Sequence, residues 1–188
     1  DTLTSIETLI LAGTMISVAE ILGDLPGEDL ILNGTNQDDT LEGGLGDDVY
    51  YIDNNKDRVL EEEDGGIDHV FAAADISLYS HSQHIENLTL EGDGDYKGVG
   101  NGADNVITGN RGDNILKGGR GDDTLYGGRG DDRLDGSEDD DHMIGGRGND
   151  EYTVDSTGDR VTEQEDEGHD QVRSSVSFTL WEHSQYIE

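Results

Sequence analysis

The chain has 188 residues, with 45 Asp and Glu against 11 Lys and Arg, and a formal net charge of −34. This charge excludes unaided binding to a nucleic-acid backbone; without Cys, disulfides and thiolate metal sites are excluded, and no apolar run is long enough for a transmembrane helix. The carboxylates must be neutralised before such a chain can become compact, because like charges repel at short range.

The first 33 residues match a pattern that returns later in the chain. Residues 6–13 resemble residues 85–92, and an insertion follows. Within the insertion, Ser17 and Glu20 have the spacing of a capping box, which predicts a short helix over residues 14–22. We expect residues 1–33 to be the end of a preceding spacer plus this insertion, in a piece of a longer array.

Nine-residue units begin at Gly34 and Gly43. Each unit has Asp at position six and an apolar residue at position eight. The period continues in degraded form to Asp57, nine residues after Asp48, and then to Asp68 after a two-residue slip. The position-six residues of this stretch are Asp39, Asp48, Asp57 and Asp68. We predict a first repeat block over residues 34–71.

Residues 72–99 contain no such unit and form a spacer. Apolar and polar residues alternate in Ile76-Ser77-Leu78 and Leu88-Thr89-Leu90. This alternation predicts β-strands that continue the architecture of the repeats.

Further units run without a gap from Gly100 to Thr153, and degraded copies extend this second block to residue 173. The cleanest unit, residues 118–126, reads GGRGDDTLY. The apolar residues at position eight are Ile107, Leu116, Leu125, Leu134, Met143 and Tyr152. The position-six residues are Asn105, Asn114, Asp123, Asp132, Asp141, Asp150, Asp159 and Asp170.

A longer repeat organises the chain as a whole. Residues 50–86 align without gaps on residues 152–188, with 17 identities in 37 positions. Residues 174–188 are therefore expected to begin the next spacer.

The nonapeptide has the form GGxGxDxUx. Glycine permits tight turns at positions one to six, and positions seven to nine suit a three-residue strand with one inward side chain. The pattern resembles the calcium-binding RTX (hemolysin-type) repeats of secreted bacterial toxins, proteases, lipases and adhesins. The resemblance implies an all-β fold: a right-handed parallel β-roll, or β-solenoid, with two units per coil and Ca²⁺ in the turns.

Turns on one side are then 18 residues apart, and coils about 4.8 Å apart bring like charges together. Ca²⁺ resolves this conflict because it accepts six to eight oxygens at about 2.3–2.6 Å. The resemblance implies that several ions are bound by the position-six residues named above and by backbone carbonyls of the glycine-rich stretch. The glycines implied are Gly119, Gly121, Gly128, Gly130, Gly146 and Gly148.

The implied function is structural and not enzymatic. The resemblance implies that the unfolded chain is exported by type I secretion, folds outside the cell on binding Ca²⁺, and stabilises other segments of the same long chain. Two alternatives stay open. One is an adhesin or lectin-like segment that binds a cell-surface glycan through Tyr79 and Trp181; the other is the repeat tail of a secreted lipase, protease or alginate epimerase.

Other motifs have simpler interpretations. Arg-Gly-Asp occurs at Arg111, Arg120 and Arg129, where Arg offsets neighbouring carboxylates rather than marking an integrin ligand. His81 and His84 are interpreted as a solvent-side or strand-edge pair rather than a zinc site. Tyr79 and Trp181 are expected to be buried by packing, and the acidic runs 61–64 and 163–167 to be solvated turns, or outer ligands at most.

Overall fold

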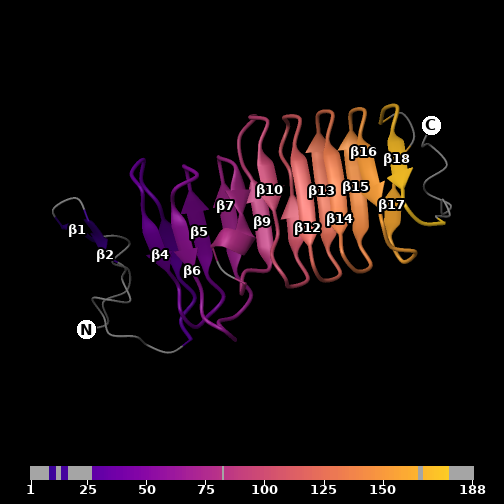
Figure 1. Ribbon diagram of the computed structural model, residues 1–188. Coiled ribbons are helices and arrows are strands. Elements are labelled where there is room, and N and C mark those ends of the chain that lie inside the picture. The colour runs from indigo at the N-terminus through magenta and orange to yellow at the C-terminus, as the bar shows by residue number, and fades with distance from the viewer. Residues whose placement is uncertain (1–8, 12–13, 17–26, 82, 165–166, 178–188) are drawn as a thin grey trace.

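The computed structural model describes residues 9–11, 14–16, 27–81, 83–164 and 167–177. Short parallel strands build most of this part of the chain and lie side by side in sequence order (Figure 1). Successive strands mostly alternate between two long sheets, so a coil consists of two strands and two turns. The all-β, parallel β-solenoid expected from the sequence is confirmed.

The larger sheet has eight strands. They are β3 (Ile31–Asn33), β5 (Val49–Ile52), β7 (His69–Ala72), β9 (Asn87–Leu90), β11 (Val106–Thr108), β13 (Thr124–Arg129), β15 (His142–Arg147) and β17 (Arg160–Thr162). The second sheet has six strands. They are β8 (Ile76–Ser77), β10 (Lys97–Val99), β12 (Ile115–Gly119), β14 (Arg133–Ser137), β16 (Glu151–Val154) and β18 (Gln171–Ser174). Strands β4 (Thr40–Glu42) and β6 (Arg58–Leu60) pair with each other.

Within the second block, the strand register has the expected 18-residue coil. Ile107 lies opposite Leu125, and Leu125 lies opposite Met143. In the spacer, the offset is 22 residues between Ile76 and Gly98 and 19 between Asn87 and Val106. The coil lengthens to 20 residues at two places, where Tyr50 pairs with Val70 and Tyr152 with Val172. These are the positions of the two-residue slips in the sequence.

The expected helix over residues 14–22 is wrong in its described part. Thr14–Ile16 forms strand β2, which pairs antiparallel with β1 (Leu9–Leu11). The β-branched Thr14 and Ile16 favour an extended backbone over a helix. Residues 17–22 lie outside the described residues, and a single 3₁₀ turn, η1 (Leu78–Ser80), follows β8.

The core is a thin ladder of inward side chains between the two sheets. The six position-eight side chains from Ile107 to Tyr152 are each at most 1% exposed. The ladder continues through the spacer with Ile76, Leu78 and Leu88, all buried. Because β9 pairs with both β7 and β11, one sheet runs through both repeat blocks.

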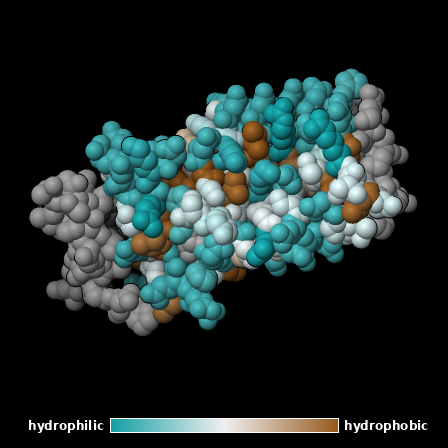
Figure 2. Space-filling model, in the orientation of Figure 1, coloured by the Kyte–Doolittle hydropathy of each residue, from teal (hydrophilic) through white to brown (hydrophobic). Residues whose placement is uncertain are grey.

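The visible surface is largely hydrophilic, with a few hydrophobic side chains on the strand faces between the turns (Figure 2). In the described ranges, no helix is long and apolar enough to cross a membrane.

Candidate metal centres

The position-six side chains point into the roll from the turns that precede the strands. Of those predicted as ligands, Asp39 is half-buried and all others are at most 2% exposed. The structure therefore brings the predicted residues together in rows, one member per coil. Glu86 extends one row through the spacer, since its Oε2 accepts the backbone N–H of Asp68 at 2.8 Å.

One oxygen of each buried carboxylate is bound to the neighbouring coil. Oδ1 of Asp132 accepts the backbone N–H of Asn114 at 2.7 Å. In the same way, Oδ1 of Asp141 accepts the N–H of Asp123 at 2.9 Å. These bonds tie successive turns together along each row.

The second oxygen is different. It is buried and has no hydrogen-bond partner in six position-six residues of the described chain, namely Asp48, Asp68, Asp123, Asp132, Asp141 and Asp150. A buried carboxylate oxygen without a partner is costly. A hard cation with oxygen ligands fits this donor set, and Ca²⁺ tolerates its irregular geometry.

The local electrostatics agree with a cation at these positions. Burial raises the pKa of Asp123 and of Asp132 to about 8, and the neighbouring carboxylates Asp141 and Asp150 add to the rise. Burial also raises the pKa of Asp141 to about 7. A bound dication would restore the ionised form of such groups.

The six glycines expected to offer carbonyl ligands all have positive φ, between 93° and 140°. Their conformational role is clear, because these angles place them in the region that favours glycine. Different glycines, at position one, lie against the carboxylates. A Cβ at Gly127 would lie 2.5 Å from Oδ2 of Asp132, so a side chain there would displace the carboxylate. The sequence carries this signal as the invariable glycine that opens each unit.

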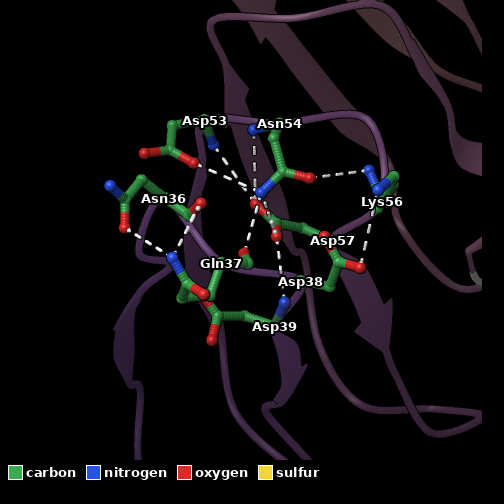
Figure 3. Close-up of polar contacts among 8 residues, drawn as sticks. All are labelled: Asn36, Gln37, Asp38, Asp39, Asp53, Asn54, Lys56 and Asp57. Carbon is green, nitrogen blue, oxygen red and sulfur yellow. Dashed lines mark hydrogen bonds and ion pairs between the residues drawn. The ribbon is translucent and has the colours of Figure 1, made fainter. Parts of the chain in front are cut away.

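Three position-six residues, Asp39, Asp57 and Asp159, differ from the six that have an oxygen without a partner. Figure 3 shows Asp39 and Asp57 in two facing turns, with Oδ1 of Asp57 accepting the N–H of Asp39 at 3.0 Å. Oδ2 of Asp39 accepts the hydroxyl of Thr35 at 2.7 Å. Asp159 resembles them, since its Oδ2 accepts backbone N–H groups of its own turn. Protein donors already occupy these oxygens.

The two asparagines also make their own contacts. Oδ1 of Asn105 accepts the N–H of Asn101 at 2.8 Å, and its Nδ2 donates to the carbonyl of Ile85 at 2.9 Å. Oδ1 of Asn114 accepts the N–H of Asn110 at 2.8 Å.

A second ladder, at position five, was not foreseen. Oδ1 of Asp113 accepts the N–H of Asp131, and Oδ1 of Asp131 accepts the N–H of Asn149, both at 2.8 Å. These side chains are exposed, and the acceptor belongs to the earlier coil rather than the later one. Every unit of the second block has Asp or Asn at position five, which is the signal in the sequence.

Among the residues that the structure describes, two groups of three carboxylates have ligand oxygens within 4.8 Å of one another: Asp48, Glu61 and Asp68, and Asp150, Glu163 and Asp170. The acidic run 163–167 is expected from the sequence to be a solvated turn. This expectation is wrong for Glu163, because its side chain is only 2% exposed. Its Oε2 is buried and has no hydrogen-bond partner. Glu163 lies outside the nonapeptide register, so the period alone did not reveal it.

The other motifs have structural roles. The ring nitrogens of His81 lie 2.7 and 2.8 Å from the carbonyl oxygens of Ser77 and Asp57. Arg120 pairs with Glu138 at 3.1 Å, as expected for an Arg that offsets carboxylates. Tyr79 is 72% exposed, so its expected burial is wrong. Trp181 lies outside the described residues.

Comparison with known proteins identifies the repeats. The family described as RTX calcium-binding nonapeptide repeat (4 copies) matches residues 31–59, 99–134 and 118–152. The endo-1,3-1,4-beta-glycanase ExsH of Rhizobium meliloti (strain 1021) is 33% identical over 81 residues. That match covers 43% of this chain, and the chain spans only 17% of the relative's length. No solved structure matches the chain. Given these matches and the parallel β-solenoid around them, the chain carries RTX calcium-binding nonapeptide repeats at residues 31–59 and 99–152.

Proposed function

We propose that this chain is a calcium-dependent folding module of a larger secreted protein. It folds outside the cell when Ca²⁺ enters the turns, and it stabilises and spaces the segments beside it. The single observation that carries this proposal is the set of six buried position-six carboxylates in which one oxygen is bonded to the backbone and the other has no partner.

The ligands proposed in the second block are Oδ2 of Asp123, Asp132, Asp141 and Asp150. Each of these oxygens lies beside the position-one glycine of its own unit. Carbonyls of the glycine-rich stretch complete the oxygen set. Five further position-six residues are proposed as weaker ligands because protein donors already occupy a side-chain oxygen of each. They are the neutral Asn105 and Asn114 and the acidic Asp39, Asp57 and Asp159.

The energetic argument rests on the thin core. One inward side chain per strand offsets little of the backbone entropy of folding, about 1–2 kcal/mol per residue. A formal charge of −34 opposes compaction further. Calcium binding to sites absent from the unfolded chain then supplies folding free energy directly.

Export follows from the same physics. Extracellular calcium modules bind at about 10⁻⁴–10⁻³ M, so the chain would remain unfolded at the low free Ca²⁺ of the cell interior. An unfolded chain can pass through a type I export channel and fold only after it emerges.

A calcium titration followed by far-ultraviolet circular dichroism tests this function. We expect conversion from coil to β-structure at submillimolar to millimolar Ca²⁺, reversed by a chelator, with little response to Mg²⁺. A β spectrum that is unchanged by chelation would overturn the proposal.

The glycanase relative supports one more specific setting, in which this module accompanies an enzyme that acts on glycans. The match covers 43% of this chain but only 17% of the relative. The repeats would then be the tail of the enzyme and not its catalytic part. Assaying a longer chain for glycan hydrolysis, with and without residues 1–188, would separate this setting from that of an adhesin, which would bind glycans without cleaving them.

A further inference from the structure

A third carboxylate enters the roll at each 20-residue coil. In the later one, Glu163 follows strand β17 and reaches between Asp150 and Asp170. All three side chains are at most 2% exposed. Oε2 of Glu163 and Oδ2 of Asp150 are buried and have no hydrogen-bond partner, so both oxygens can coordinate a cation.

A tyrosine fixes the position of the third carboxylate. The hydroxyl of Tyr152 donates to Oε1 of Glu163 and accepts the N–H of Gly145 at 2.7 Å. A Cβ at Gly145 would overlap both this hydroxyl and Oδ2 of Asp150. Gly145, Tyr152, Asp150 and Glu163 therefore pack against one another in a fixed geometry. Oε1 of Glu163 accepts the tyrosine hydroxyl, and Oε2 has no protein partner.

The arrangement occurs twice. In the earlier 20-residue coil, the hydroxyl of Tyr50 donates to Glu61, and Glu61 lies with Asp48 and Asp68. A Cβ at Gly43 would overlap the Tyr50 hydroxyl and Oδ2 of Asp48, as Gly145 does in the later copy. Glu61 is half-buried, and its Oε1 accepts the N–H of Gly44 at 3.0 Å, so this copy is the more open one.

The negative charges of Asp150, Glu163 and Asp170 favour binding of a cation. The carboxylates that act electrostatically on Glu163 are Asp170, Asp150 and Glu167, all of the same sign. Oxygens within 4.8 Å of one another suit a single ion, since ligands about 2.3–2.6 Å from Ca²⁺ lie up to about 5 Å apart across it.

We propose that Asp150, Glu163 and Asp170 bind one Ca²⁺ through three carboxylates, with Tyr152 as the positioning residue, and that Asp48, Glu61 and Asp68 with Tyr50 form a second such site. These two sites bind Ca²⁺ more tightly than the positions between 18-residue coils, because affinity rises with the number of charged ligands and with the rigidity of the site. The inference rests on the proposed calcium-dependent folding and adds ligands that lie outside the nonapeptide pattern.

Calorimetric titration of the 188-residue chain with Ca²⁺ tests the ligands. In the double variant Glu61→Gln with Glu163→Gln, the Ca²⁺ affinity of the tightest phase should fall about tenfold or more. The control Glu42→Gln with Glu62→Gln removes the same charge from two exposed side chains and should keep that phase. If the tight phase has the same affinity in the double variant as in the control, the inference is overturned, while the proposed calcium-dependent folding is not affected. Absence of calcium binding by the wild-type chain would instead overturn the proposed function.

The tyrosines give an independent test. Tyr50→Phe with Tyr152→Phe keeps both rings in the core and removes only the hydroxyls. We expect about a tenfold loss of affinity in the tight phase, with the full β spectrum at saturating Ca²⁺. An unchanged affinity would contradict the positioning role. Glu163→Asp separates geometry from charge: it should also weaken binding, whereas wild-type affinity would show that charge alone matters and would overturn the assignment of Glu163 as a direct ligand.

Discussion

The backbone N–H of Asp132 donates to Oδ1 of Asp150 in the next coil at 2.7 Å, although both side chains are acidic and buried. One carboxylate oxygen thus serves the protein fold, while the other has no protein partner. The two oxygens of a position-six residue therefore have separable roles, and substitutions can remove one role or both.

Replacing Asp132 by Asn should separate these roles. Asp132→Asn keeps an oxygen that can accept the N–H of Asn114 but removes the charge, so the calcium midpoint should rise while the saturated fold persists. Asp132→Ala also leaves that N–H without its acceptor, and should cost about 1–3 kcal/mol more at saturating Ca²⁺. Calcium titrations and thermal melts measure both effects. Glu42→Gln, on an exposed strand position, is the charge control; a midpoint for Asp132→Asn equal to that of the control would reject Asp132 as a ligand.

The metal-free chain should respond to acid in the opposite sense to most proteins. Burial raises the pKa of Asp123, Asp132 and Glu163 in the folded chain to about 8, well above about 4 for unfolded carboxyls. Folding then takes up protons, so the stability from these groups is fully present below about pH 4 and is lost as the pH rises through about 8. In a chelator, acidification from pH 8 should increase the β signal.

With saturating Ca²⁺, the same acidification should weaken binding, because protons compete with the ion for the carboxylates. Circular dichroism across pH, with and without calcium, checks both directions at low protein concentration. A metal-free β signal that falls on acidification would contradict the burial of ionisable groups in these rows.

One unit has lost two of its glycines but keeps their backbone conformation. Ser137 and Asp139 have φ of 77° and 82°, which costs a non-glycine residue about 1–3 kcal/mol. Ser137→Gly should therefore stabilise the calcium-bound chain by about 1 kcal/mol, measured by thermal or denaturant unfolding. The reverse change, Gly128→Ser (φ 108° at Gly128), should destabilise it, and equal stability in all three chains would refute the strain.

The core should control calcium affinity without contacting calcium. Leu125 is fully buried, and Leu125→Ala should cost about 2–5 kcal/mol. Because folding and binding are coupled, the calcium midpoint should move to higher concentration although no ligand is lost. Tyr126→Ala, at the next and exposed position of β13, is the matched control. A midpoint that responds equally to both changes would argue against the thin-core explanation.

The sequence predicted what recurs every nine residues. Position-eight burial, the 18-residue coil and the burial of position six follow from the period, because each repeats the same local geometry. Ser137 and Asp139 show a limit of this reasoning: their unit departs from the pattern, yet neighbouring coils hold its turn in the same conformation.

Features off the period escaped prediction. The burial of Glu163 depends on the two-residue slip and on Tyr152, which belongs to a different strand. Tyr79 is exposed because it lies in the 3₁₀ turn η1 rather than in a strand. At Thr14–Ile16, strand pairing with Leu9–Leu11 overrode a local capping pattern.

Small-angle X-ray scattering of the whole chain tests the central claim most directly, namely that cations in the turns are required for the compact state. In a chelator, the radius of gyration should approach about 46 Å, the value expected for an unfolded chain of this length. In millimolar Ca²⁺ it should fall well below that value and fit the stacked roll. The same compact scattering curve in both conditions would contradict the account.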